Sequence, residues 1–213
     1  MNLPTKTIET RYDYYKVIPW FIKNASKIIG REYVIPSSER AIVFAMLAWM
    51  LRDDLVADEM GFDLNKGILL TGPIGCGKTT LFKILKECKL NKSDFEVISS
   101  RQVVSEFLKD GFDIIDKYSF TTNGNNLRNI KSFCFDDLGT EKITKYFGND
   151  CNVMGEILLS RYELFKQKNT ITHITTNLSA KEIETLYGKR IRSRMREMFN
   201  LFGYEESSED KRK

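Results

Sequence analysis

The segment at residues 72–80, GPIGCGKTT, has the residue types needed to hold the phosphates of a nucleotide. Its spacing is G-x-x-x-x-G-K-T, and glycines in such a loop let successive N–H groups turn toward phosphate oxygens. Lys78 would place an ammonium group on the β- and γ-phosphates, and the Thr79 hydroxyl would bind Mg²⁺. The expected nucleotide-binding residues of this loop are Gly72, Pro73, Ile74, Gly75, Cys76, Gly77, Lys78, Thr79 and Thr80.

The segments on either side of this loop are those that a phosphate loop requires. Residues 67–71 form a short apolar run, the pattern of a buried strand, and residues 79–88 carry apolar side chains at helical spacing. The loop therefore joins a strand to a helix N-terminus, where the backbone dipole favours an anion. A chance glycine turn is the alternative, and this context argues against it. We predict that the loop binds a nucleoside triphosphate.

Two adjacent carboxylates follow a second apolar run in SFCFDDLG, residues 132–139. Asp136, at the end of the predicted strand, could hold Mg²⁺ opposite Thr79, and Asp137 could orient or deprotonate an attacking water. Two neighbouring carboxylates are costly to bury without a compensating charge, which favours a metal. The alternative is a helix N-cap after a strand.

Asn177 closes a β-branched run at residues 170–177, TITHITTN. Its amide would lie beside the γ-phosphate if this strand lies between the other two, whereas the alternative is an ordinary turn asparagine. His173 lies inside the same strand, and we expect a core histidine rather than a catalytic one.

A basic segment at residues 188–197, GKRIRSRMRE, is the last segment whose residue types could take part in the chemistry of the site. Arg190 and Arg194 are four residues apart and share one face of a helix. The simpler interpretation is a solvated basic helix, or one that contacts DNA phosphates. The more specific interpretation is an arginine finger that reaches the triphosphate of a neighbouring subunit.

Predicted strands and helices alternate through the middle of the chain. Strands are expected at 67–71, 95–100, 131–139 and 170–177, and helices at 79–88, 101–109, 152–165, from 179 and at 190–198. Before them, helices are expected at about 20–29 and 38–60, the latter closing at Gly61, and a turn or mobile loop at 123–126. This alternation predicts an α/β protein with a parallel sheet and a nucleotide at its carboxyl edge.

Composition is that of an ordinary globular chain of 213 residues, with 29% charged and 42% hydrophobic residues. The net charge of +4 permits nucleic-acid binding without proving it. Four cysteines without C-x-x-C pairing and a single histidine argue against a zinc site or a disulfide framework. The first residues lack the apolar core of a signal peptide, and the longest apolar run, 41–51, is too short to span a bilayer. We expect a soluble cytoplasmic protein.

Four segments together, GPIGCGKTT, FCFDDLG, ITTNL and YGKRIRSRM, resemble the AAA+ ATPases in order and spacing. Within that group they are similar to the DnaC/DnaI helicase loaders and their IstB transposition-helper relatives, over residues 65–201. The resemblance implies a P-loop NTPase of the AAA+/ASCE type, a three-layer αβα sandwich without a C-terminal helical lid domain. We expect a helical N-terminal segment at 1–60, which the resemblance does not cover, an ATPase core at 61–203 and a charged, solvated tail at 204–213. The aromatic residues of the first segment make it a candidate partner contact, and packing as an ordinary flank of the core is the alternative.

The resemblance also implies roles for individual residues. Asp136 would organise Mg²⁺, Asn177 would be the sensor-1 residue, Arg194 the finger acting in trans and Arg190 its supporting partner. Arg212 is the one candidate for an arginine that senses the γ-phosphate in cis. Many members have Glu where this chain has Asp137, and the shorter side chain implies slow hydrolysis.

The implied function is an ATP-binding ATPase that assembles into a homo-oligomer through its ATP site and acts on single- or double-stranded DNA. Its most specific form is the loading of a replicative hexameric helicase, with ATP and Mg²⁺ as cofactors. An IstB-like helper of a transposase has the same ATPase and another client. A small-molecule kinase is the alternative from another class, although the sequence shows no acceptor site for one.

Overall fold

The computed structural model describes residues 9–90, 94–120, 130–146, 149–205, 208, 210 and 211. The chain divides into two compact units. One comprises Met1–Leu64 and Lys83–Ser93, and the other comprises Asn65–Phe82 and Asp94–Lys213. The turn expected at 123–126 lies outside the described residues.

The first unit is helical: α1 (Tyr14–Ile29), the 3₁₀ turn η1 (Ser37–Glu39), α2 (Arg40–Leu51) and α3 (Asp54–Met60). The single helix predicted for residues 38–60 is wrong, because the chain breaks at Arg52, whose φ is 59°. Asp53 then starts α3, with its carboxylate accepting the Val56 N–H at 3.3 Å. The predicted end at Gly61 is confirmed, with a left-handed φ of 72°.

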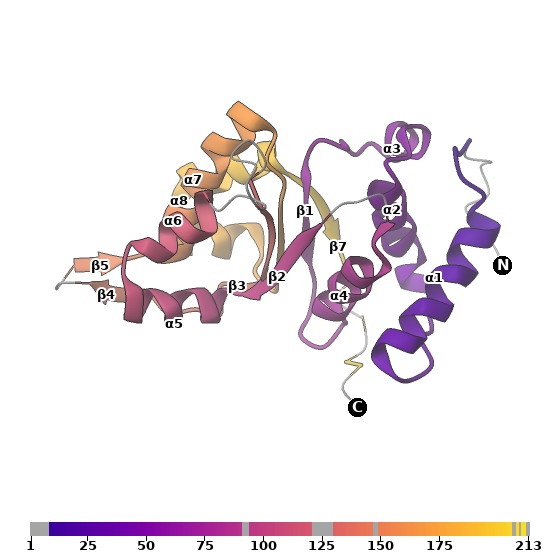
Figure 1. Ribbon diagram of the computed structural model, residues 1–213, viewed down its shortest axis with the longest axis horizontal. Coiled ribbons are helices and arrows are strands. Elements are labelled where there is room, and N and C mark those ends of the chain that lie inside the picture. The colour runs from indigo at the N-terminus through magenta and orange to yellow at the C-terminus, as the bar shows by residue number, and fades with distance from the viewer. Residues whose placement is uncertain are drawn as a thin grey trace. The chain divides into compact units, whose positions relative to one another are not determined.

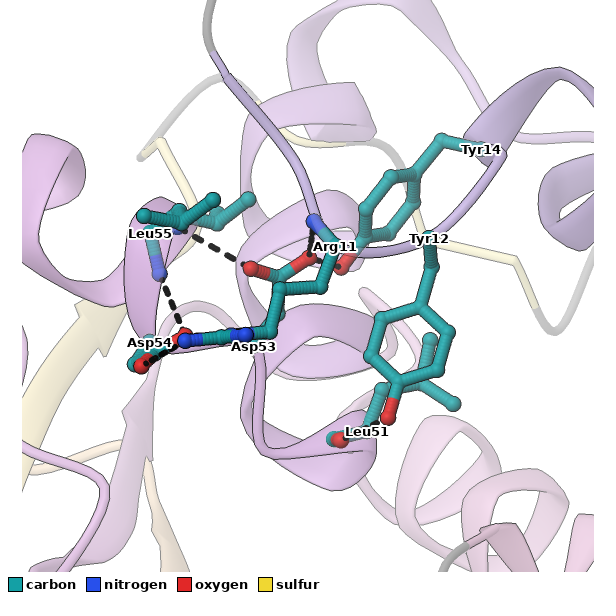
Figure 2. A network of polar contacts seen from close by, with 8 residues as sticks. Arg11, Tyr12, Tyr14, Leu51, Asp53, Asp54 and Leu55 are labelled. Atoms are coloured by element: carbon teal, nitrogen blue, oxygen red, sulfur yellow. Dashed lines mark hydrogen bonds and ion pairs between the residues drawn. The ribbon is translucent and has the colours of Figure 1, made fainter.

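Helix α1 begins six residues earlier than the predicted start at Trp20, because Asp13 provides an N-cap. The segment before it is tied to the corner between α2 and α3 (Figure 2). The buried Asp53 carboxylate accepts the Arg11 N–H at 3.0 Å and the Tyr14 hydroxyl at 3.1 Å. The Arg11 guanidinium pairs with Asp54 and lowers the pKa of that carboxyl to about 2. These contacts fix where α1 starts.

The second unit is built on a five-stranded sheet in the order β2-β3-β6-β1-β7 (Figure 1). All neighbouring strands are parallel, which confirms the predicted α/β architecture. The strands are β1 (Gly67–Thr71), β2 (Phe95–Ser99), β3 (Ser132–Leu138), β6 (Thr172–Thr176) and β7 (Phe199–Gly203). Strand β6 lies between β3 and β1, which is the placement that the expectation for Asn177 requires.

The helices of this unit largely match the predicted ones. They are α4 (Lys78–Cys88), whose later part belongs to the first unit, α5 (Ser100–Asp110), α6 (Asp113–Phe120), α7 (Val153–Lys168) and α8 (Ala180–Met198). Helix α8 is broken at Gly188, with φ 85° and ψ 161°, which accounts for the two helices predicted there. The sequence did not predict α6, β7 or the antiparallel pair β4 (Thr144–Tyr146) and β5 (Asn149–Cys151). The described part of the chain contains no separate lid domain.

Buried Arg161 joins α7 to the sheet through hydrogen bonds to neutral acceptors. Its guanidinium donates to the Thr172 hydroxyl at 2.6 Å and to the carbonyls of Tyr118 and Ile171, each at 2.9 Å. Burial lowers the pKa of Arg161 to about 9. A network of neutral acceptors satisfies most of its donors, so the side chain holds α7 at the start of β6.

His173 is a core residue, as predicted. Its side chain is 1% exposed, its Nδ1 accepts the Ile68 N–H at 3.2 Å, and it packs beside the rings of Phe82 and Phe95. Burial, and to a lesser extent the nearby Arg161 guanidinium, lowers the pKa of His173 to about 3. The neutral ring therefore links β6 to β1.

We expect this histidine to make unfolding pH-dependent. The unfolded chain takes up a proton below about pH 6.5, whereas the folded chain resists protonation down to about pH 3, so stability falls as pH falls between these values. The free energy of unfolding in urea should drop by up to about 1.4 kcal/mol per pH unit below that upper limit. His173→Asn, whose amide oxygen can still accept the Ile68 N–H, is the control and should flatten the slope between pH 6.5 and 5. An unchanged slope in that variant would assign the effect to other groups.

Candidate nucleotide-binding site

The loop at residues 72–80 connects β1 to α4, as the sequence predicts. Gly75 and Gly77 have φ angles of 85° and 99°, which side chains rarely tolerate and which a phosphate-cradling loop uses to orient its N–H groups. Helix α4 begins at Lys78, so its N-terminal N–H groups open toward the loop. The backbone therefore has the form of an anion-binding site.

Lys78 links this loop to the end of β6. Its side-chain ammonium donates to the carbonyls of Gly72 and Pro73, each at 2.8 Å, and to the Asn177 amide oxygen at 2.5 Å. The residue is only 5% exposed. The structure thus brings together Lys78 and Asn177, although they are far apart in sequence.

Thr79 and Asp136 form the second contact across the site. The Thr79 hydroxyl lies 2.8 Å and 3.0 Å from the two carboxylate oxygens of Asp136. One hydroxyl and one carboxylate suit Mg²⁺, which in nucleotide sites takes few protein ligands and completes its shell with water and phosphate oxygens. Within the described ranges no group of three His, Cys, Asp or Glu side chains could hold a metal, so a protein-only metal cage is not present there.

Thr175 is a site residue that the sequence analysis missed. Its buried hydroxyl donates to Asp136 Oδ1 at 2.7 Å and accepts the Asp137 N–H at 2.9 Å. It therefore fixes the orientation of the Asp136 carboxylate from the neighbouring strand. The sequence does hint at this role, because Thr175 lies two residues before Asn177 and alternate residues of a strand face the same side. That alternation alone does not distinguish a hydroxyl of the site from a hydroxyl of the core.

Asp137 lies at an irregularity in β3, where the pairing with β6 shifts between Phe135 and Leu138. Its φ is 55°, in the left-handed region that Asp and Asn enter more readily than Glu. Its carbonyl accepts the Thr140 N–H and hydroxyl at 3.2 Å and 2.8 Å, which holds this turn. The backbone geometry thus gives a physical reason for Asp rather than a longer acid at this position.

Comparison with known proteins was made for the whole chain. No protein-family model matches the sequence, and no curated protein matches it. Solved structures do match: the crystal structure of the DnaC helicase loader superposes with a TM-score of 0.57 and 16% identity, covering 81% of this chain and 93% of that one. The chain shares the fold of that structure.

Two further structures support that fold. A primosome component from Streptococcus pyogenes serotype M3 has a TM-score of 0.56 and 18% identity over 83% of this chain and 85% of its own. The DnaI structure has a TM-score of 0.53 and 19% identity over 81% and 88% of the two chains. The expected resemblance to the DnaC/DnaI loaders is confirmed at the level of the fold.

Glu141 follows the turn after β3, and its carboxylate accepts two hydrogen bonds. Its carboxylate accepts the Gly139 N–H at 2.9 Å and the Tyr187 hydroxyl. Burial, followed by the adjacent Glu141 charge, raises the pKa of Tyr187 well above its ordinary value, so the tyrosine stays protonated as a donor. These contacts tie the segment after the two aspartates to α8.

Arg194, the expected finger, is held by α7 and not by the phosphate loop. It forms an ion pair with Glu163 at 3.2 Å, and its guanidinium carbon lies 4.6 Å from the centre of the Tyr162 ring. Arg190 is exposed. No hydrogen bond between Arg194 and the loop occurs among the described residues.

The remaining basic candidates are placed differently. Arg192 forms an ion pair with Glu184 of the same helix. Arg212 lies outside the described residues.

The helices of the described chain include none that is long and apolar enough to cross a membrane.

Proposed function

We propose that this chain binds ATP with Mg²⁺, hydrolyses it slowly and assembles with copies of itself through the ATP site. In this proposal it acts on DNA and loads a replicative hexameric helicase. The proposed binding residues are those of the loop at 72–80. Thr79 and Asp136 hold the metal, Asp137 activates water, Asn177 contacts the γ-phosphate, and Arg190 and Arg194 serve a neighbouring subunit.

The observation that carries the ATPase proposal is the pairing of Lys78 with Asn177 and of Thr79 with Asp136. Each pair joins a phosphate- or metal-binding group of the loop to a polar group at the end of a neighbouring strand. Bound ATP and Mg²⁺ would come between these partners and offer each of them a new contact of the right charge. Two such pairs at one sheet edge support nucleotide chemistry better than a loop alone.

The client is proposed from the fold. One of the matched structures is named a helicase loader and another a primosome component, and both cover most of this chain. The transposase-helper alternative requires the same ATPase, and no contact in the chain favours it. A small-molecule kinase would form ADP only in the presence of an acceptor, which separates it from an ATPase.

Asp137→Asn is expected to keep ATP and Mg²⁺ but to lose turnover by about a hundredfold or more, because an amide cannot accept a proton. The substitution should not strain the backbone, since Asn tolerates the φ of 55° at this position. Phosphate release without any acceptor measures it. Unchanged turnover would remove the role of Asp137 and make Glu141 the next candidate.

Asp137→Asn, which is expected to bind ATP without hydrolysing it, also tests whether the chain binds a replicative helicase. Mixed with a purified hexameric replicative helicase and ATP, it should co-elute with the helicase in size-exclusion chromatography, and less so with ADP. Lack of co-elution by a variant that still binds ATP would contradict the loader proposal while leaving the ATPase intact.

A further inference from the structure

The chain after β7 returns along the phosphate loop. The Tyr204 N–H donates to the Thr71 carbonyl at 2.9 Å, and the Lys211 N–H donates to the Gly75 carbonyl at 3.0 Å. Tyr204 is 7% exposed. Tyr204 and Lys211 of the tail expected to be solvated are therefore bonded instead, the first to the end of β1 and the second to the loop.

Two charged side chains of this tail lie against the loop glycines. A Cβ built on Gly75 would lie 2.0 Å from Asp210 Oδ1, so the carboxylate rests directly on the backbone of Gly75. A Cβ built on Gly77 would lie 3.4 Å from Lys211 Nζ. The Lys211 ammonium also lies 5.7 Å from the centre of the Tyr204 ring. A negative and a positive group therefore border the same anion-binding loop.

The Asp210 carboxylate would repel the phosphates of a bound nucleotide, and the Lys211 ammonium would attract them. The loop N–H groups and Lys78 attract phosphate, whereas a carboxylate a few ångströms away repels it, and charge interactions over such distances are only partly screened. The Lys211 ammonium opposes this repulsion. Glycine at 75 is what allows Asp210 to approach so closely.

We propose that Asp210 and Lys211 set the affinity of the phosphate loop for its nucleotide, with Asp210 weakening it and Lys211 strengthening it. The proposal rests on the proposed function, because it requires the loop to bind a nucleotide. It assigns to these two residues the role of tuning nucleotide release. The effect follows phosphate charge, so it is greater for ATP than for AMP.

The experiment measures the Kd of a fluorescent ATP analogue with Mg²⁺ for the full chain. Asp210→Asn should bind about three- to tenfold more tightly than wild type, and Lys211→Gln should bind more weakly by a similar factor. Both changes should shrink at high salt. The matched control is Asp116→Asn, which makes the same change in net charge at an exposed residue of α6, a helix drawn well apart from β1 (Figure 1).

The outcomes separate this proposal from the one on which it rests. A wild-type chain that binds no nucleotide would contradict the proposed function itself. Wild-type binding with an Asp210→Asn affinity that is unchanged, or changed only as much as by Asp116→Asn, would overturn the role of the tail. Opposite shifts in the two tail variants would support it, since a general loosening of the tail would move both in one direction.

Discussion

Lys78→Ala is expected to lose ATP affinity by about a hundredfold or more. The ammonium makes the charge-assisted contact with the β- and γ-phosphates, and one or two bonds to a charged group are worth about 3 kcal/mol together. The wild-type side chain also joins the loop carbonyls of Gly72 and Pro73 to Asn177, so its removal additionally frees the loop from β6. Titration with a fluorescent ATP analogue measures the change.

Lys83→Ala provides the control for Lys78→Ala. Lys83 is an exposed lysine in the next turn of α4, and its removal subtracts the same charge from the same helix. It should leave ATP affinity nearly unchanged. Normal ATP affinity in Lys78→Ala would remove the nucleotide-binding proposal altogether.

Arg194→Ala is expected to bind ATP normally yet to hydrolyse it about a thousandfold more slowly and to assemble weakly. An arginine finger acts on the transition-state charge of a neighbour's triphosphate, and its loss costs far more than the roughly 1 kcal/mol or less of a surface ion pair. Arg194 forms an ion pair with Glu163, and loss of that pair alone predicts only a small effect. Phosphate release and sedimentation with ATP measure the two consequences.

Mixing variants gives the sharper test of a finger in trans. Arg194→Ala keeps an intact loop and Lys78→Ala keeps an intact finger, so a mixture should recover part of the activity that each lacks alone. Arg196→Ala, an exposed arginine in the same helix, should behave like wild type. Full activity of Arg194→Ala in a chain that stays monomeric with ATP and DNA would replace the finger with a DNA-contacting helix.

The parts of the fold that could be read from the sequence are those with a local signal. The β-branched run of β6, the apolar run of β1 and the helix start expected at 179 each lie within a few residues of the observed element. Strand β7 could not be predicted this way. It follows α8 without a turn, and two of its five residues are exposed, so only pairing with β1 makes it a strand.

The site also contains residues that the sequence predicted and residues that it did not. Lys78, Thr79 and Asp136 have types and spacing that imply phosphate and metal chemistry, and the structure brings them together with Asn177. Thr175 could not be found, because its role depends on which strand lies beside β3. The approach of Asp210 to Gly75 was also hidden, since a charged tail carries no periodicity that tells where it packs.

The strand order has a consequence for how the chain acquires its site during synthesis. Strand β1, which carries the phosphate loop, pairs only with β6 and β7, whose residues begin at Thr172 and Phe199. A growing chain made from its N-terminus exposes the apolar residues of β1 until more than a hundred further residues have emerged. The proposed nucleotide site is therefore assembled late, because both strands that flank β1 are made long after it.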